Sequence, residues 1–584
     1  MPPRIPPLWC ADTLVAVDIC AAPEAVNPSE PADFALRNDL WDGPAGTVRL
    51  AGAAGEIVDF QLVLEKRTGQ LEAVRLEGGG DLSLAVLQHI AVPVDGSFLD
   101  DPVVPLDPAR AGEASTEISR KAPRFPGRRR QCFLVEIAIP RGTKPGPREA
   151  FLIVRAGGEE MRLKIALKVH GFELPERATC VADLNCYSRA TGAGYQGGQE
   201  ESERYRAIER EHFRMAREHL GLFHLLPYGH SGRIEDGYAP KLAGRGRSRK
   251  VADWAPFDTH WGGYLDGSAF RGCRGGEHPV EYLYLPVNLN WPAYFENFGS
   301  PGYEAEFRNV LGEMARHFAE RGWKQTRFEV FFNHKTRWKY FPWDMDEIRF
   351  DRDNYATALF ARMATDAVKT TPQVKFINRI DSSWIFNKSA RTELGDLIQL
   401  WVVNRSSQSE APDESAELRR KGQAIWPYGG AGPIPAPNRL DCLRWPWLAW
   451  GREVDGFVWW NALGWGNWEA VGRGNDHCMY AGARFGLSGP LASLRLKTLR
   501  RGMQDHAYLT LLGRKAGSRA AADAVVGRTI GSKDREDWYQ RGEGVEAGGA
   551  DIQTTSRTAK AWNTAPRSAW LAARSELARA IEKA

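Results

Sequence analysis

The chain has 584 residues, of which 43% are apolar, and this is enough for two or three domains with a sizeable core. Its 77 basic and 73 acidic residues leave a formal charge of +4, which gives no reason to expect nucleic acid as a partner. No stretch has the apolar length of a membrane span, and the N-terminus lacks the continuous apolar core of a signal peptide. We therefore expect no membrane partner, and either a cytoplasmic location or that of a mature exported form.

Eight cysteines are scattered along the chain, with no C-x-x-C pair and no spacing typical of metal ligands. This distribution indicates neither a zinc site nor a disulfide framework, so we expect single reduced or buried cysteines, with neither a metal nor a cofactor. The 21 tryptophans and 16 tyrosines are a second compositional feature. Flat rings with polar edges suit sugar faces, although a large aromatic core accounts for part of this number.

Residues 1–176 are rich in short runs of alternating apolar and polar residues, as in 57–64, 132–139 and 161–169. Glycine and proline turns such as 140–147 separate the runs. This pattern predicts an N-terminal β-sandwich domain, with its exit at 171–176.

From residue 177 to 490 apolar strands alternate with long amphipathic helices, for which 203–220, 303–321 and 353–369 are the clearest candidates. This alternation predicts a (β/α)8 barrel of the triosephosphate isomerase type as the catalytic domain. A glycine-rich stretch at 231–277 is expected to form a long loop over the barrel mouth. The predicted strands are 181–187, 222–228, 282–287, 327–332, 374–380, 397–403, 423–428 and 455–461.

Residues 491–584 are predicted to form a C-terminal helical extension packed on the barrel. An amphipathic helix begins at 491, a polar loop covers 528–556, and a last helix covers 566–583. The predicted fold class is therefore multidomain, β followed by α/β.

The fourth predicted barrel strand leads into two adjacent acids. Phe328, Val330, Phe331 and Phe332 indicate a buried strand, and the polar residues Asn333 and Lys335 follow it. A short aromatic loop then brings the carboxylates Asp346 and Glu347. Adjacent acids in loops are most often only solvated, but in α/β barrels active sites are built where strands end in such loops. We therefore predict that Asp346 and Glu347 are the catalytic residues of a glycoside hydrolase.

Polar and aromatic residues also close most of the other predicted barrel strands. Any one of them has a structural interpretation as a cap, a turn or a satisfied core group. Their occurrence at nearly every strand end on one face of a barrel instead favours a carbohydrate pocket. With Asn333 and Lys335, the predicted substrate-binding residues are Asn185, Tyr228, Asn288, Arg379, Asp381, Trp426, Tyr428, Trp459, Trp460 and Asn461.

Several segments, in a consistent order from about residue 50 to 515, resemble glycoside hydrolase family 123 and its wider relatives. They are 56–64, 133–175, 253–270, 284–292, 331–335, 343–347, 456–461 and 491–509. The resemblance implies an N-terminal β-sandwich, a catalytic barrel and release of β-linked N-acetylgalactosamine. It also implies that the family's adjacent catalytic Asp-Glu pair corresponds to Asp346 and Glu347.

Adjacent acids fit ordinary double displacement poorly, because consecutive strand residues point to opposite faces and retaining enzymes need carboxyl groups about 5 Å apart across the sugar. They fit substrate assistance better: the 2-acetamido oxygen attacks the anomeric carbon, Glu347 is the acid and base, and Asp346 orients the acetamido group. Two alternatives stay open. One is a non-catalytic carbohydrate-binding barrel. The other is a glycosidase for a sugar without an acetamido group, for which Asp381 is the candidate second carboxylate. We expect a glycan substrate and a monomer or homodimer.

Overall fold

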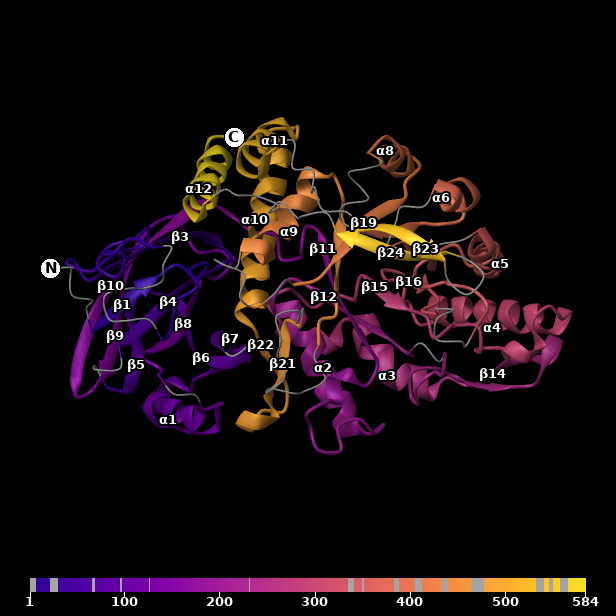
Figure 1. The fold of residues 1–584 in the computed structure, drawn as a ribbon, viewed down its shortest axis with the longest axis horizontal. Coiled ribbons are helices and arrows are strands. Elements are labelled where there is room, and N and C mark those ends of the chain that lie inside the picture. The colour runs from indigo at the N-terminus through magenta and orange to yellow at the C-terminus, as the bar shows by residue number, and fades with distance from the viewer. Residues whose placement is uncertain are drawn as a thin grey trace.

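The computed structural model describes residues 7–20, 30–65, 69–94, 97–124, 127–229, 232–334, 341–348, 351–382, 388–404, 412–431, 434, 440–463, 477–531, 540–545, 550–556 and 566–584. An all-β part formed by the N-terminal residues lies beside a larger part in which strands and helices alternate (Figure 1). The long helix α10 (Leu494–Lys515) lies between the two parts (Figure 1).

The all-β part consists of two five-stranded sheets that share one hydrophobic core, and we call it the sheet pair. The first sheet has the order β1 (Leu8–Ala11), β4 (Ile57–Glu65), β8 (Arg130–Ala138), β6 (Ser83–Val94) and β7 (Ser97–Pro105). The second has the order β2 (Trp41–Asp42), β3 (Thr47–Ala54), β10 (Glu159–Glu173), β9 (Gly146–Ala156) and β5 (Leu71–Gly78). Helix α1 (Ala111–Lys121) lies against β5.

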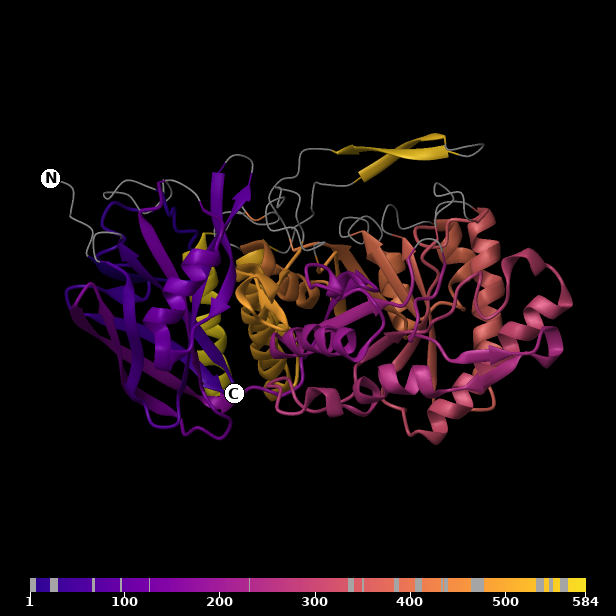
Figure 2. The same cartoon turned by 90° about the horizontal axis from the view of Figure 1, so that it is seen from below.

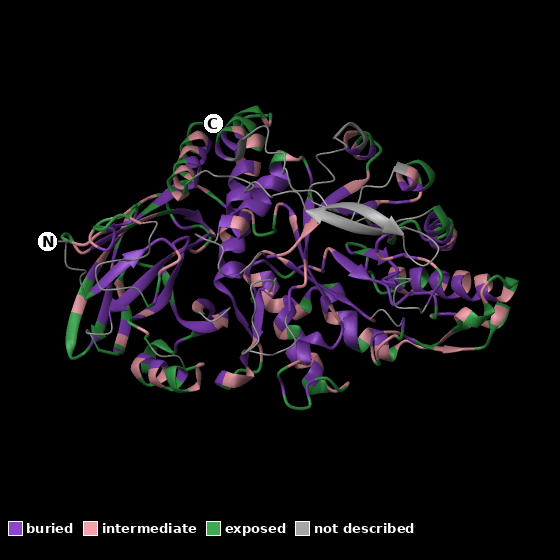
Figure 3. Cartoon of the chain, viewed as in Figure 1, coloured by how far each residue is buried: buried purple, intermediate pink, exposed green. Residues whose placement is uncertain are grey.

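The two sheets differ in how many of their faces are buried. Along β10, Leu163, Ile165, Leu167 and Val169 are buried while residues 162, 164, 166 and 168 are exposed or half-buried, as expected of a strand with one face on the core. In β4 nearly every residue is buried (Figure 3), because α10 and the segment at residues 12–15 cover its second face. Two acids of the first sheet pair with the helix, Asp59 of β4 with Arg500 at 3.1 Å and Glu136 of β8 with Lys497 at 3.0 Å.

Eight parallel strands form the barrel sheet, and the predicted strands are confirmed at each of the eight places. The two end strands, β12 and β15, also contact each other, so the barrel is nearly closed. The order is β12 (Leu222–Leu226), β11 (Val181–Tyr187), β20 (Gly456–Trp460), β19 (Ala424–Gly429), β18 (Leu400–Asn404), β17 (Lys375–Ser382), β16 (Arg327–Val330) and β15 (Tyr282–Tyr284).

A helix follows each barrel strand in the chain, as in a (β/α)8 fold. In chain order these helices are α2 (Glu203–Glu218), α3 (Ala255–Asp266), α4 (Pro301–Glu320), α5 (Asp351–Val368), α6 (Lys388–Leu394), α8 (Pro412–Arg420), α9 (Leu440–Gly451) and α10.

The prediction of a long loop at 231–277 is wrong. Besides the small strands β13 (Lys241–Ala243) and β14 (Lys250–Asp253), the segment contains α3, the helix that follows β12. The N-cap residue of α3, Trp254, stacks on His317 of α4 with ring centroids 3.9 Å apart, and Asp258 bonds to the same histidine at 2.8 Å. Gly262 and Gly263 within the helix and Gly267 at its end made the segment look like a loop from its composition.

The C-terminal region also differs from its prediction. Helix α10 follows β20 and lies beside α9, so it takes the place of the eighth barrel helix as well as joining the sheet pair. Helices α11 (Ala520–Val526) and α12 (Arg567–Lys583) pack against α10. The segment predicted as a loop at 528–556 contains an antiparallel hairpin, β23 (Gln540–Val545) and β24 (Ala550–Ser556), which projects from the rest of the chain (Figure 2). Among the described residues, no helix combines the length and the apolar character needed to span a membrane.

Candidate active site

The two predicted catalytic acids lie between the carboxyl ends of neighbouring strands, β16 and β17. The backbone N–H groups of Met345 and Asp346 donate to the carbonyl oxygen of His334, at 2.9 and 3.1 Å, just beyond β16. The N–H of Ile348 donates to the carbonyl oxygen of Asp381 in β17 at 3.1 Å. Because the carboxyl ends of the parallel strands form the mouth of the barrel, these three bonds hold the acid pair at the mouth.

Asp346 is half-buried and is held through its side chain by Asn333. With the amide oriented so that both its ends find partners, the Asn333 nitrogen donates to the Asp346 carboxylate at 2.8 Å, and its oxygen accepts from the Tyr187 hydroxyl at 3.2 Å. Glu347, the neighbour of Asp346, is 9% exposed. The hydrogen bond from Asn333 fixes the orientation of the Asp346 carboxylate.

An aromatic wall lies across the mouth from the acids, on β11, β20 and β19. Tyr187, Trp460 and Tyr428 are all half-buried, and the rings of Tyr187 and Trp460 meet edge to face with centroids 4.7 Å apart. Burial raises the pKa of Tyr428 well above its usual range, and the carboxylates of Glu347 and Asp346 add to the rise. Asn461, next to Trp460, is half-buried as well.

Four other predicted binding residues, Asn185, Asn288, Tyr228 and Arg379, are buried. Asn185 donates to the Tyr284 hydroxyl at 2.5 Å inside the barrel, and Asn288 accepts from the backbone N–H of Asn290 at 2.7 Å. The Tyr228 hydroxyl donates to the Phe331 carbonyl at 2.5 Å, and its ring stacks on that of His334 with centroids 5.8 Å apart. The fourth, Arg379, belongs to a charged network.

That network fills the barrel interior beneath the acid pair. The Arg379 guanidinium bonds to the carboxylates of Asp381 at 2.8 Å, Glu329 at 3.2 Å and Asp183 at 3.3 Å, and His224 bonds to Asp183 at 3.0 Å. All of these groups are nearly inaccessible to solvent. Three carboxyl groups thus share one guanidinium, and its removal would leave their charges buried without compensation.

The protonation of Asp381 is the unusual electrostatic feature of this network. Burial raises its pKa to about 7, Arg379 opposes the rise and the nearby Asp346 adds to it. Burial also raises the pKa of Glu329, with His224 and Arg379 acting in the opposite direction. Asp381 therefore titrates near neutral pH directly under the acid pair, and its charge acts on Asp346.

Two of the predicted binding tryptophans are not brought to the mouth. Trp426 has no exposed surface; its indole N–H donates at 2.7 Å to Asp455, which precedes β20, so the ring lies toward the amino end of the barrel. Trp459 is 1% exposed and packs edge to face on Trp445 of α9, outside the barrel sheet. The prediction that these two rings line the pocket is corrected, because a strand's aromatic residues are divided among its two faces and two ends. Lys335 lies outside the described residues.

Sequence reasoning missed Asp183, His224 and Glu329. Their only signal is a charged residue within a strand that is otherwise apolar, as in residues 181–187 and 327–332. In the described part of the chain, the one group of side chains that could hold a metal lies in the sheet pair and not at this mouth.

No protein-family model and no curated protein matches the sequence. Among solved structures, a family 123 glycoside hydrolase from Clostridium perfringens, described for hydrolysis of glycolipid glycans, has a TM-score of 0.62 at 13% identity, over 99% of this chain and 98% of its own.

Two other matches are weaker. An endo-β-1,4-mannanase from Thermotoga petrophila has a TM-score of 0.32 at 9% identity, over 57% of this chain and 77% of its own. A β-glucuronidase from Bacteroides uniformis has a TM-score of 0.28 at 10% identity, over 76% of this chain and 52% of its own. The resemblance to family 123 seen in the sequence is confirmed at the level of the fold, because the chain shares its architecture over its whole length with a family 123 glycoside hydrolase.

Proposed function

We propose that the protein is a retaining glycoside hydrolase that releases a β-linked 2-acetamido sugar from a glycan, with N-acetylgalactosamine as the favoured sugar. The observation that carries the proposal is the adjacent pair Asp346–Glu347, fixed by backbone bonds at the barrel mouth with Asn333 on its aspartate. The fold shared with a family 123 enzyme described for glycolipid glycan hydrolysis supports the choice of substrate class. The predicted division into a β-sandwich to residue 176, a barrel to 490 and a C-terminal extension belongs to the same proposal, with α10 shared between the last two.

In the first step, the Glu347 carboxyl group gives its proton to the glycosidic oxygen as the bond from that oxygen to the anomeric carbon breaks. The acetamido carbonyl oxygen of the sugar attacks the same carbon and forms a cyclic oxazolinium ion. In the second step, the Glu347 carboxylate takes a proton from water, whose oxygen opens the ring at the anomeric carbon. The two inversions give net retention, and Glu347 ends protonated as it began.

Asp346 has the complementary role of stabilising charge. The acetamido N–H becomes more acidic as positive charge builds up on the ring, and an ionised carboxylate next to it stabilises that charge. Asn333 donates to Asp346 and so fixes its orientation. Tyr187, Trp460 and Tyr428 form the surface on which the sugar ring is expected to stack.

The surroundings of Asp381 do not favour ordinary double displacement. Asp381 is 6% exposed, and its carboxylate is bonded to Arg379 inside the barrel. A nucleophile for a sugar without an acetamido group would have to face the anomeric carbon from the mouth.

The experiment that tests the proposal is inhibition by a thiazoline analogue of the cyclic intermediate, measured beside proton NMR of the first-formed anomer. We expect tight competitive inhibition, because enzymes bind best what resembles their transition state, together with retention of configuration. Inversion, or labelling of a carboxylate by a 2-fluoro sugar that traps a covalent intermediate, would contradict substrate assistance.

A further inference from the structure

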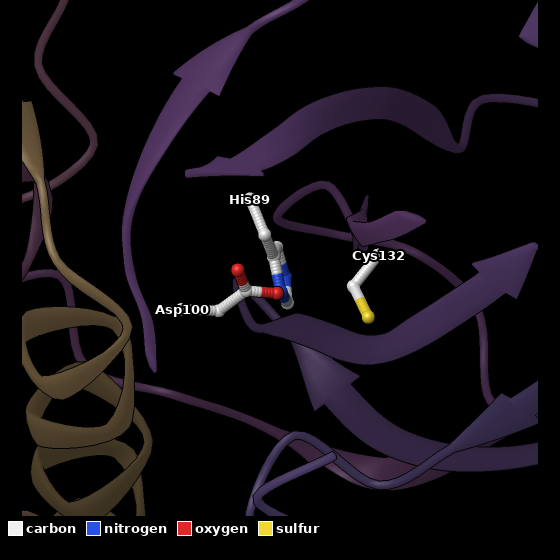
Figure 4. Close-up of side chains that lie close together, drawn as sticks. All are labelled: His89, Asp100 and Cys132. Carbon is white, nitrogen blue, oxygen red and sulfur yellow. The ribbon is translucent and has the colours of Figure 1, made fainter. Parts of the chain in front are cut away.

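Three chemically different side chains lie close together in the first sheet of the sheet pair (Figure 4). His89 comes from β6, Asp100 from β7 and Cys132 from β8, which are neighbours in the sheet. His89 and Cys132 have no exposed surface and Asp100 is 8% exposed. A ring nitrogen, a carboxylate oxygen and the thiol sulfur all lie within 4.8 Å of one another.

We propose that His89, Asp100 and Cys132 form a structural binding site for a transition-metal ion, with zinc as the favoured ion. Imidazole nitrogen, carboxylate oxygen and cysteine sulfur are the donors that zinc takes in proteins, at about 2.0 to 2.3 Å from the ion. Donor atoms already within 4.8 Å of one another reach such distances by small side-chain rotations. Because the thiolate prefers zinc over magnesium or calcium, the donor set also excludes the hard cations.

Charge supports the assignment. A zinc ion with one thiolate and one carboxylate is neutral, which suits a site with almost no access to water. One oxygen of Asp100 lies 3.4 Å from the Nδ1 atom of its fellow ligand His89, and the other lies 3.9 Å from the guanidinium of Arg128, which is outside the ligand set. Second partners of this kind orient metal ligands and raise their affinity.

The position of the site gives it a structural role. The next residue along β7, Asp101, accepts from Arg495 of α10 at 3.0 Å and from the Tyr480 hydroxyl at 2.6 Å. An ion that ties β6, β7 and β8 together would therefore also fix the strand that contacts α10. Loss of the ion should loosen the junction between the sheet pair and the barrel, without touching the acid pair.

The separation of the three residues explains why spacing in the sequence did not predict them. Positions 89, 100 and 132 belong to three strands, and no two of them are close in the chain. The usual zinc signatures place two ligands within a few residues.

The test uses the full chain as purified, with metal content measured by mass spectrometry and cobalt(II) titrated into protein stripped by a chelator. We expect about one zinc per chain, and a thiolate-to-cobalt charge-transfer band in the near ultraviolet. In Cys132→Ser the band should vanish, and in His89→Gln the zinc content should fall. Cys10→Ser, which alters a buried thiol of the same sheet on β1, should keep both.

Metal content well below one equivalent together with no charge-transfer band in the wild type would overturn the proposal, and this readout does not depend on whether a variant folds. A band that persists in Cys132→Ser, if that variant is folded, would also contradict the assignment. None of these readouts involves glycosidase activity, so failure here and failure of the proposed function are separate results.

Discussion

The side-chain amide of Asn333 donates a hydrogen bond of 2.8 Å to the carboxylate of Asp346, and this contact joins the end of the β16 strand region to the acid loop. The bond holds the Asp346 carboxylate in one orientation before a sugar binds, so the side chain does not have to be ordered during the reaction. Asn333 is itself 2% exposed and accepts from Tyr187, which makes it a link between the acids and the aromatic wall.

Asn333→Ala should lower kcat by about tenfold to a hundredfold, the range expected for loss of a hydrogen bond to a charged group. The matched control is Asn309→Ala on α4, where a half-buried asparagine donates only to backbone carbonyls of residues 247 and 249. Steady-state rates on an aryl substrate measure both. Equal rates for Asn333→Ala and wild type would show that the contact has no part in catalysis.

Glu347→Gln and Asp346→Asn should differ in their dependence on the leaving group. The glutamate supplies a proton, so Glu347→Gln should lose about a hundredfold to ten-thousandfold with poor leaving groups and much less with activated ones. Asp346→Asn should lower the rate by a similar factor for all leaving groups, because the charge of Asp346 acts on the sugar and not on the departing oxygen. A series of aryl glycosides gives the two slopes of log kcat/KM against leaving-group pKa. The same slope for both variants would contradict this division of roles.

Arg379→Met should destabilise the fold by about 3 to 5 kcal/mol, because it leaves the carboxyl groups around it buried without their cation. Arg308→Met on α4 is the control: its 2.7 Å pair with Asp366 joins side chains that are 40% and 39% exposed, and such pairs contribute about 1 kcal/mol or less. Urea unfolding of both variants measures the difference. A loss no larger than that of the control would mean that the network does not depend on Arg379.

Asp381→Asn should change how stability depends on pH. The folded-state pKa of Asp381 is raised to about 7, so between its unfolded value of 3.8 and pH 7 the folded chain keeps a proton that the unfolded chain has lost. The free energy of unfolding of the wild type therefore falls as pH rises through this window, by up to about 1.4 kcal/mol for each pH unit, and this fall ends above it.

Asparagine does not titrate, so the stability of Asp381→Asn relative to wild type should rise across the same window and then stay constant. Urea unfolding of the two proteins at several pH values between about 4 and 8 shows the difference. Parallel curves for the two proteins would mean that Asp381 titrates as an ordinary carboxylate.

Trp460→Ala should raise KM by about threefold to tenfold, the effect of losing one aromatic contact, with a smaller change in kcat. Trp254→Ala, at the start of α3 on the outside of the barrel, should leave KM unchanged. Initial rates over a range of substrate concentrations provide the comparison. An unchanged KM for Trp460→Ala would remove this ring from the sugar surface.

The eight barrel strands could be predicted from the sequence because each is a short apolar run between turn residues and helices, as in residues 400–404. The acid loop was predictable for a related reason: polar groups follow an otherwise buried strand at Asn333. Helix α3 could not be predicted so well, since glycines surround it. The role of α10 could not be predicted either, because the sequence of an amphipathic helix does not show whether the helix covers one hydrophobic core or two.

The local sequence pattern likewise does not determine how deep within the barrel a side chain lies. Trp426 and Trp460 both follow apolar strand residues, yet one lies toward the amino end of the barrel and the other at its mouth. Which strand residues face inward depends on tilt and register, so the meeting of Arg379 with Asp183, Glu329 and Asp381 from three strands becomes visible only in the folded chain.

The most direct test is a matched pair of aryl β-glycosides with the same leaving group, one of N-acetylgalactosamine and one of galactose, assayed with wild type and with Glu347→Gln. We predict release from the acetamido sugar by the wild type, little or no release from the galactoside, and loss of activity in the variant when the leaving group is poor. Equal release from both sugars, or an acetamido activity that Glu347→Gln retains in full, would contradict a substrate-assisted reaction at Asp346 and Glu347.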